Sequence, residues 1–180
     1  MHNIYCFVGP SGSGKSAIVD SLSTEYGLVP VYSYTERPRR TAFEKGHIFV
    51  SPEDFDMLED LVAYTIYNGY RYGVPSQMVD DSDLYVIDPA GIEYLKHKYK
   101  GNKGIFVIGI DCPEELCKKR MLQRGDGEDN ANSRLEYDKE AFKELYNICD
   151  VIIPNTGDLM TVVDKVYSVI SSEEEGNEQQ

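Results

Sequence analysis

Residues 9–16, Gly-Pro-Ser-Gly-Ser-Gly-Lys-Ser, fit the pattern G-x-x-x-x-G-K-[ST], and this segment constrains the fold more than any other. An apolar run at residues 4–8 precedes it, and Ala17-Ile-Val follows it, which together predict a strand, a glycine-rich loop and a helix. Glycines adopt positive φ without steric cost, so such a loop can turn its amide groups inward toward phosphate oxygens. The segment therefore predicts a binding site for a nucleoside triphosphate.

Each position of this loop has an expected role. Lys15 should reach the β- and γ-phosphates, and the Ser16 hydroxyl should ligate Mg²⁺. The helix that follows adds unpaired amide groups and the positive end of its dipole. The residues expected to bind ATP here are Gly9, Ser11, Gly12, Ser13, Gly14, Lys15, Ser16 and Ala17.

Apolar and helical segments alternate along the 180 residues, which fits one α/β domain. Buried strands are predicted at residues 4–8, 84–88, 104–110 and 150–153, and helices at 15–26, from 51, at 91–100, from about 113, at 134–146 and at 159–170. Continuous apolar strands between helices predict a parallel sheet with helices on both faces. Residues 33–82 interrupt this rhythm and predict an inserted substrate subdomain, with two short strands in residues 61–72 around an Asn-Gly turn.

Charge and cysteine content narrow the class of protein. A net charge of −13 argues against nucleic acid or an anionic membrane as partner, because phosphate groups demand basic surface. No signal peptide or membrane-spanning run is evident, and the four cysteines lack metal-site spacing, so we expect a cytoplasmic protein. We expect it to be a monomer or homodimer. The acidic tail at residues 171–180 is expected to be disordered.

The arginines of this acidic chain gather in two places, which suggests that anionic ligands are held there. The first group is Arg37, Arg39 and Arg40, and the second is Arg120, Arg124 and Arg134. Arg120 and Arg124 are four residues apart on one predicted helix and so share a face. A polar segment follows them, and we expect residues of about 124–134 to form a mobile lid that closes arginines over the transferring phosphoryl group.

Asp88 ends a predicted strand at the edge of the sheet where ligands bind in parallel folds. It is expected either to lie near Mg²⁺ and its waters or simply to cap the helix that starts at Pro89.

The order of these motifs resembles the guanylate kinase family over roughly residues 3–165. The matching segments are residues 9–16, Ser-Tyr-Thr-Glu-Arg-Pro-Arg-Arg at 33–40, Gly-His-Ile-Phe-Val-Ser-Pro-Glu-Asp-Phe at 46–55, Asn-Gly-Tyr-Arg-Tyr-Gly at 68–73, Ile-Asp-Pro-Ala-Gly at 87–91, Lys-Lys-Arg-Met-Leu-Gln-Arg-Gly at 118–125 and Val-Ile-Ile-Pro-Asn at 151–155. After the glycine-rich loop, the segment at 33–40 is the most specific, since it resembles the signature S-x-T-x-R-P-x-R.

The resemblance implies a P-loop three-layer sandwich: a core at 1–32 and 83–170, an acceptor-binding insert at 33–82 and a short lid. It also implies roles for individual residues. The catalytic group would be Lys15, Arg120, Arg124 and Arg134, and Asn155 would lie near the adenine of ATP. The acceptor-binding group would be Ser33, Arg37, Arg40, His47, Tyr72 and Asp88, with the arginines clamping the acceptor phosphate.

Three positions depart from the family pattern where guanine would be read. Ala63 stands at the place of a glutamate, Val74 at that of a small hydroxyl residue, and Val86 at that of an acid. A site that discriminates by hydrogen bonds needs its polar partners, so acceptor choice could be loosened.

The expected activity is transfer of the γ-phosphoryl group of Mg-ATP to GMP or dGMP. One alternative is the same chemistry on another nucleoside monophosphate or on ribose 1,5-bisphosphate. The other is a non-catalytic guanylate-kinase-like binding module, which the intact glycine-rich loop disfavours.

Overall fold

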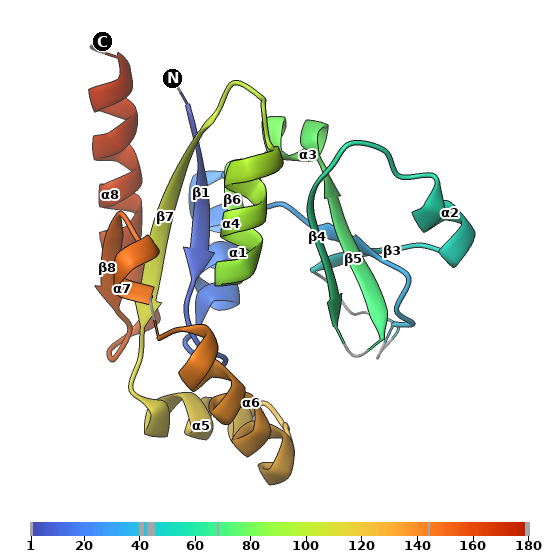
Figure 1. Cartoon of the computed structure of the whole chain (residues 1–180). Coiled ribbons are helices and arrows are strands. Elements are labelled where there is room, and N and C mark those ends of the chain that lie inside the picture. Colours follow the sequence, from blue (N-terminus) through green and yellow to red (C-terminus); the bar gives the residue numbers. More distant parts are fainter. Residues whose placement is uncertain (1, 40–41, 43–45, 68, 144, 179–180) are drawn as a thin grey trace.

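The computed structural model describes residues 2–39, 42, 46–67, 69–143 and 145–178. Its central sheet has the strand order β6-β1-β7-β8, and every pair of neighbours is parallel (Figure 1). The strands are β1 (Asn3–Val8), β6 (Leu84–Val86), β7 (Gly104–Asp111) and β8 (Val151–Pro154). The parallel sheet predicted from the four apolar runs is thereby confirmed.

Helices cover both faces of this sheet, which explains why β1 is apolar at successive positions. On one face, Tyr5 and Phe7 pack in a cluster with α1 (Lys15–Tyr26) and α8 (Leu159–Glu178). On the other face, Ile4 and Cys6 pack in a second cluster with α4 (Pro89–Lys98).

The residues predicted to form an insert build a second sheet, with the order β3-β2-β5-β4 (Figure 1). Its strands are β2 (Ser33–Thr35), β3 (His47–Phe49), β4 (Leu61–Tyr67) and β5 (Tyr70–Pro75), accompanied by the short helices α2 (Pro52–Asp56) and α3 (Ser76–Asp80). Strand β4 packs against α4, and Val62 and Val74 belong to the same apolar cluster as Ile4. The second sheet is therefore joined to the core by buried apolar contact.

Helices α5 (Glu114–Gln123) and α6 (Glu128–Ala141) lie beyond the carboxyl ends of the central strands, and α7 (Leu145–Ile148) leads into β8 (Figure 1). The helix predicted to begin at Arg134 begins earlier, at Glu128, so residues 128–133 are helical and the expected polar loop is shorter. Two acidic residues in its first turn suit the positive end of the helix dipole. Ala131 and Leu135, four residues apart on one face, are buried in a cluster with Cys117 of α5.

The expectation of a disordered acidic tail is also wrong for residues 171–178, since α8 runs to Glu178. The Glu174 carboxylate accepts a hydrogen bond of 2.6 Å from the Tyr5 hydroxyl and lies 2.6 Å from Nδ1 of His2. Contacts with the first strand thus hold a segment whose composition suggested disorder. Within the described part of the chain, every helix is too short or too polar to cross a bilayer.

Candidate active site

The glycine-rich loop connects β1 to α1 and adopts the backbone conformation that its sequence predicts. Gly9, Gly12 and Gly14 all have positive φ, at 151°, 78° and 96°. A Cβ added at Gly12 would lie 2.5 Å from the carbonyl oxygen of Cys117 in α5, so the loop and this helix touch through backbone. Only glycine fits there.

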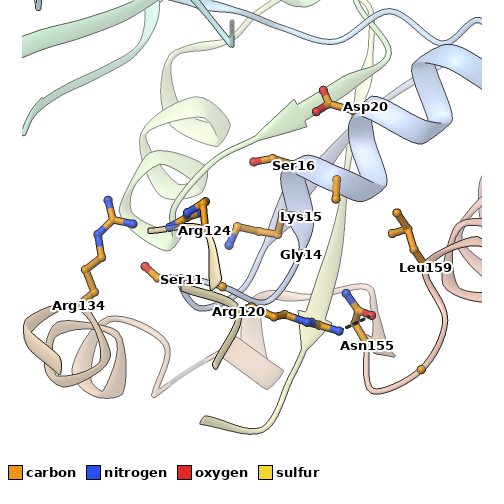
Figure 2. Close-up of a pocket in the computed structure, with 13 residues that line it drawn as sticks. Ser11, Gly14, Lys15, Ser16, Asp20, Arg120, Arg124, Arg134, Asn155 and Leu159 are labelled. Atoms are coloured by element: carbon orange, nitrogen blue, oxygen red, sulfur yellow. Dashed lines mark hydrogen bonds between the residues drawn. The ribbon is translucent and has the colours of Figure 1, made fainter. Parts of the chain in front are cut away.

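A cavity of about 560 Å³ opens above this loop and is shown in Figure 2. Its lining includes four cationic side chains, Lys15, Arg120, Arg124 and Arg134, and the carboxylate of Asp20. Four cations around one cavity, in a chain with a net charge of −13, fit an anionic ligand. The other lining residues are Ser11, Gly12, Gly14, Ser16, Ala17, Asn155, Gly157 and Leu159.

The ammonium of Lys15 is folded back onto its own loop. Its Nζ donates hydrogen bonds to the carbonyl oxygens of Gly9 (2.5 Å) and Pro10 (2.9 Å). Removal from water lowers the pKa of Lys15 to about 8, and the nearby carboxylate of Asp138 partly opposes this shift. The ammonium is thus held where phosphate charge would stabilise it.

Arg120 and Asn155 both contact the backbone of the glycine-rich loop at Ser13. Asn155 is 2% exposed, and its Nδ2 donates to the carbonyl oxygen of Ser13 (2.7 Å). The Arg120 guanidinium donates to the same carbonyl and to Oδ1 of Asn155, both at 3.4 Å. Asn155 therefore fixes the loop as well as lining the cavity, while its contact with adenine stays a prediction.

Arg124, at the end of α5, and Arg134, on α6, both reach the cavity and share one carboxylate. Arg124 Nη2 lies 2.6 Å from Oδ2 of Asp126, and Arg134 Nη1 lies 4.0 Å from the same oxygen. The Nε of Arg134 is buried without a hydrogen-bond partner in the structure. The structure therefore brings together, around one cavity, the three arginines of the second group predicted from the sequence.

Asp138 belongs to this site, although the sequence analysis did not single it out. It lies on α6, is 7% exposed, and its Oδ2 accepts the backbone N–H of Ser11 at 2.6 Å. A carboxylate inside a polar helix carries no motif. Its spacing of four residues from Arg134 was the one available signal.

The second group of predicted residues meets on the second sheet. Ser33 Oγ lies 2.9 Å from Nδ1 of His47, and Nε of Arg37 donates to the Tyr72 hydroxyl at 3.0 Å. The rings of His47 and Tyr72 lie 5.4 Å apart. Strand pairing explains this meeting, because Ser33 is in register with His47 in β3, and Thr35 with Tyr72 in β5.

Arg40 and Asp88, which were also predicted to bind the acceptor nucleotide, are not among the residues seen to meet on the second sheet. Arg40 lies outside the described residues. Asp88 is exposed and caps α4, with Oδ1 accepting the amide of Gly91 at 2.6 Å. The capping alternative is therefore observed, and a contact between Asp88 and the acceptor stays a prediction.

The positions that depart from the family pattern are apolar in the structure as well. Ala63 and Val74 face each other across β4 and β5 and are 5% and 0% exposed. No carboxylate or hydroxyl is supplied at either position to read a base.

No cluster of three or more His, Cys, Asp or Glu side chains able to hold a metal occurs among the residues that the structure describes. Ser16, at the first turn of α1, lines the cavity and is exposed. All four cysteines are free.

Comparison with known proteins gives relatives over most of the chain, although no family model matches it. Guanylate kinase from Bordetella pertussis is 33% identical over 150 residues, which are 69% of this chain and 70% of the relative. Guanylate kinase from Haemophilus influenzae is 29% identical, covering 95% of this chain and 88% of the relative. Guanylate kinase 2, chloroplastic/mitochondrial, from Oryza sativa subsp. japonica is 30% identical over 92% of this chain, which spans 62% of that longer protein.

A solved structure agrees with these sequences. The crystal structure of guanylate kinase from Anaplasma phagocytophilum has a TM-score of 0.62 at 22% identity, covering 96% of this chain and 86% of that one. The likeness shows the same α/β fold. The sequence relatives, one of them 33% identical with 70% of its length covered, show that the chain is a divergent member of the guanylate kinase family.

Proposed function

We propose that this protein transfers the γ-phosphoryl group of Mg-ATP to GMP or dGMP. The observation that carries the proposal is that cationic side chains gather in two separate places: four line the cavity above the glycine-rich loop, and Arg37 lies beside Tyr72 on the second sheet. A kinase of nucleoside monophosphates needs both, one for each phosphorylated substrate. The relatives, which are named guanylate kinases, support GMP as the acceptor.

On the donor side, the chain supplies positive charge and oriented amides. Lys15 and the loop amides would hold the β- and γ-phosphates, while Arg120, Arg124 and Arg134 face the same cavity. The transition state of phosphoryl transfer is loose, with negative charge spread over the equatorial oxygens, so positioned cations can supply most of the catalysis. We propose that residues 124–134, now seen to be largely helical, act as the lid that brings the last two arginines in.

On the acceptor side, Arg37 is the best-placed group. It is 8% exposed and already oriented by the Tyr72 hydroxyl, so little conformational entropy remains to be lost when it binds a phosphate. Ser33 and His47 lie beside it. No general base is required, because the phosphate of a nucleotide is itself an anionic nucleophile near pH 7.

Mg²⁺ would enter with ATP, and the chain offers it the hydroxyl of Ser16. When bound, the ion would neutralise charge on the β- and γ-phosphates. The residues fit this role, since Mg²⁺ bound with a nucleotide takes most of its ligands from water and phosphate rather than from a protein cage.

The experiment that tests the proposal is a coupled assay of ADP release. Mg-ATP would be offered with GMP, dGMP, AMP, CMP, UMP, dTMP or ribose 1,5-bisphosphate. We expect turnover with GMP and dGMP and a loss of about 10³-fold or more in Lys15→Ala, because the removed charge acts on the transferring group. Lys165→Ala, an exposed lysine on α8, is the matched control and should keep full activity.

Other outcomes would each redirect the proposal. Turnover confined to another acceptor would show that the buried apolar pair Ala63 and Val74 belongs to a changed acceptor site. No ADP release with any acceptor, while ATP still binds, would contradict the proposed kinase activity.

A further inference from the structure

Asp138 places a negative charge beside the glycine-rich loop, where the proposed function puts the phosphates of ATP. Its Oδ2 accepts the Ser11 amide at 2.6 Å, and the carboxylate is close enough to raise the pKa of Lys15. Amides of this loop are the groups that bind phosphate oxygens in P-loop proteins. In this structure, a carboxylate oxygen therefore accepts from an amide that could bind a phosphate oxygen.

The position of Ser11 in the cavity indicates which phosphate is concerned. In Figure 2, Asn155 and Leu159 lie at one end of the cavity, while Ser11 and Arg134 lie at the other. If adenine occupies the end near Asn155, as proposed above, the phosphate chain runs across Lys15 toward Ser11. The terminal phosphate would then meet the Asp138 carboxylate.

Two negative charges in this partly dehydrated site repel each other, so the γ-phosphate of ATP would compete with Asp138 for the Ser11 amide. Arg134 stands one helical turn before Asp138, on the same face of α6, and its buried Nε has no hydrogen-bond partner. Arrival of the γ-phosphate would expel the carboxylate and offer that guanidinium a partner. One face of α6 thus carries both Asp138, which accepts the Ser11 amide, and Arg134, which could bind the γ-phosphate.

We propose that Asp138 is a positioning residue that ties helix α6 to the glycine-rich loop and is displaced by the γ-phosphate of ATP. The inference rests on the proposed binding of ATP in this cavity. Its consequence is a selective penalty on ligands that carry a γ-phosphate: ATP must break the carboxylate contact, whereas ADP, which ends one phosphate earlier, leaves it in place.

The test compares the affinity of ATP and ADP, by calorimetry without acceptor, in the full-length wild type and in Asp138→Asn. The asparagine keeps an oxygen that can accept the Ser11 amide but removes the charge. We expect ATP to bind on the order of tenfold more tightly to the variant, with ADP changed by less than about twofold, because hydrogen bonds to charged groups are the strong ones. Glu140→Gln, an exposed position on the same helix, loses the same charge and should change neither affinity.

Asp138→Ala guards against a fold defect in the first variant. This variant also removes the oxygen that accepts the Ser11 amide, so its ratio of ATP to ADP affinity should rise at least as much as in Asp138→Asn. An unchanged circular dichroism spectrum would show that the variant is folded. A ratio that is the same in wild type and both variants would overturn the inference while leaving ATP binding intact. Weaker ATP binding only in the presence of Mg²⁺ would overturn it too, since Asp138 would then be a metal ligand. Failure of the wild type to bind either nucleotide would refute the proposed function itself.

Discussion

The depressed pKa of Lys15 predicts that ATP affinity falls as the pH rises through about 8. Loss of hydration lowers this pKa to about 8, whereas bound phosphates would favour the charged ammonium and raise it. Binding is therefore coupled to uptake of a proton at a pH between those two values, and affinity is lost with rising pH across that interval.

The magnitude follows from the pKa. With a value of about 8, roughly nine-tenths of the Lys15 side chains are protonated at pH 7 and roughly one-tenth at pH 9, so the dissociation constant for ATP should rise about tenfold between them. The terminal phosphate ionises near pH 6 and adds little change in this range.

Isothermal calorimetry at pH 7, 8 and 9, in two buffers of different ionisation enthalpy, measures both the affinity and the proton uptake. Lys15→Arg is the control, because a guanidinium stays charged over the whole range and should give a flat profile. An affinity for ATP that is constant up to pH 9, or that falls only near the ordinary lysine pKa above 10, would refute the reasoning.

Three further predictions concern single contacts. Arg37→Ala should reduce kcat/KM for the acceptor by about 10- to 100-fold with little change in ATP affinity, in steady-state assays; a defect confined to ATP would show that the acceptor clamp is misplaced. Gly12→Ala should cost about 1–3 kcal/mol in urea unfolding and weaken ATP binding, because the new Cβ meets the backbone of Cys117. Gly27→Ala is the control, because Gly27 also has positive φ but a Cβ there would meet no other atom. Equal losses of unfolding free energy in the two variants would show that backbone strain, and not the clash with Cys117, causes the effect. Glu174→Gln should lower the free energy of unfolding by about 0.5–1.5 kcal/mol near pH 7, since the hydrogen bond from Tyr5 loses its charged acceptor, whereas exposed Glu175 should tolerate the same change; equal stability of the two variants would count against that contact.

The glycine-rich loop shows that local sequence alone can predict backbone conformation. Its strand, turn and helix depend on neighbours within a few residues, so Gly9, Gly12 and Gly14 could be assigned their backbone roles from spacing alone. The four apolar runs likewise predicted a parallel sheet, because strands buried on both faces have no polar alternation. The meeting of Ser33 with His47, by contrast, was inferred from family resemblance and not from the local pattern.

The two wrong expectations share a cause. Composition made residues 125–133 look like a polar loop and residues 171–178 look disordered, but residues 128–133 and 171–178 are helical and are held by contacts with other elements. Helix α6 buries Ala131 and Leu135 against α5, and Glu174 bonds to Tyr5, 169 positions away. Polar composition reports the exposed face of such helices and says nothing about what covers the other face.

The sequence by itself determined the phosphate loop, the central sheet and the residue types of both anion sites, because short-range backbone geometry and hydrophobic periodicity act over a few residues. Only the tertiary structure decided which distant groups meet those sites. It placed Asp138 on the Ser11 amide across 127 positions and Asn155 on the Ser13 carbonyl across 142. Such contacts depend on how the chain closes in three dimensions, and a hydrogen bond between distant groups leaves no periodic signal in the sequence.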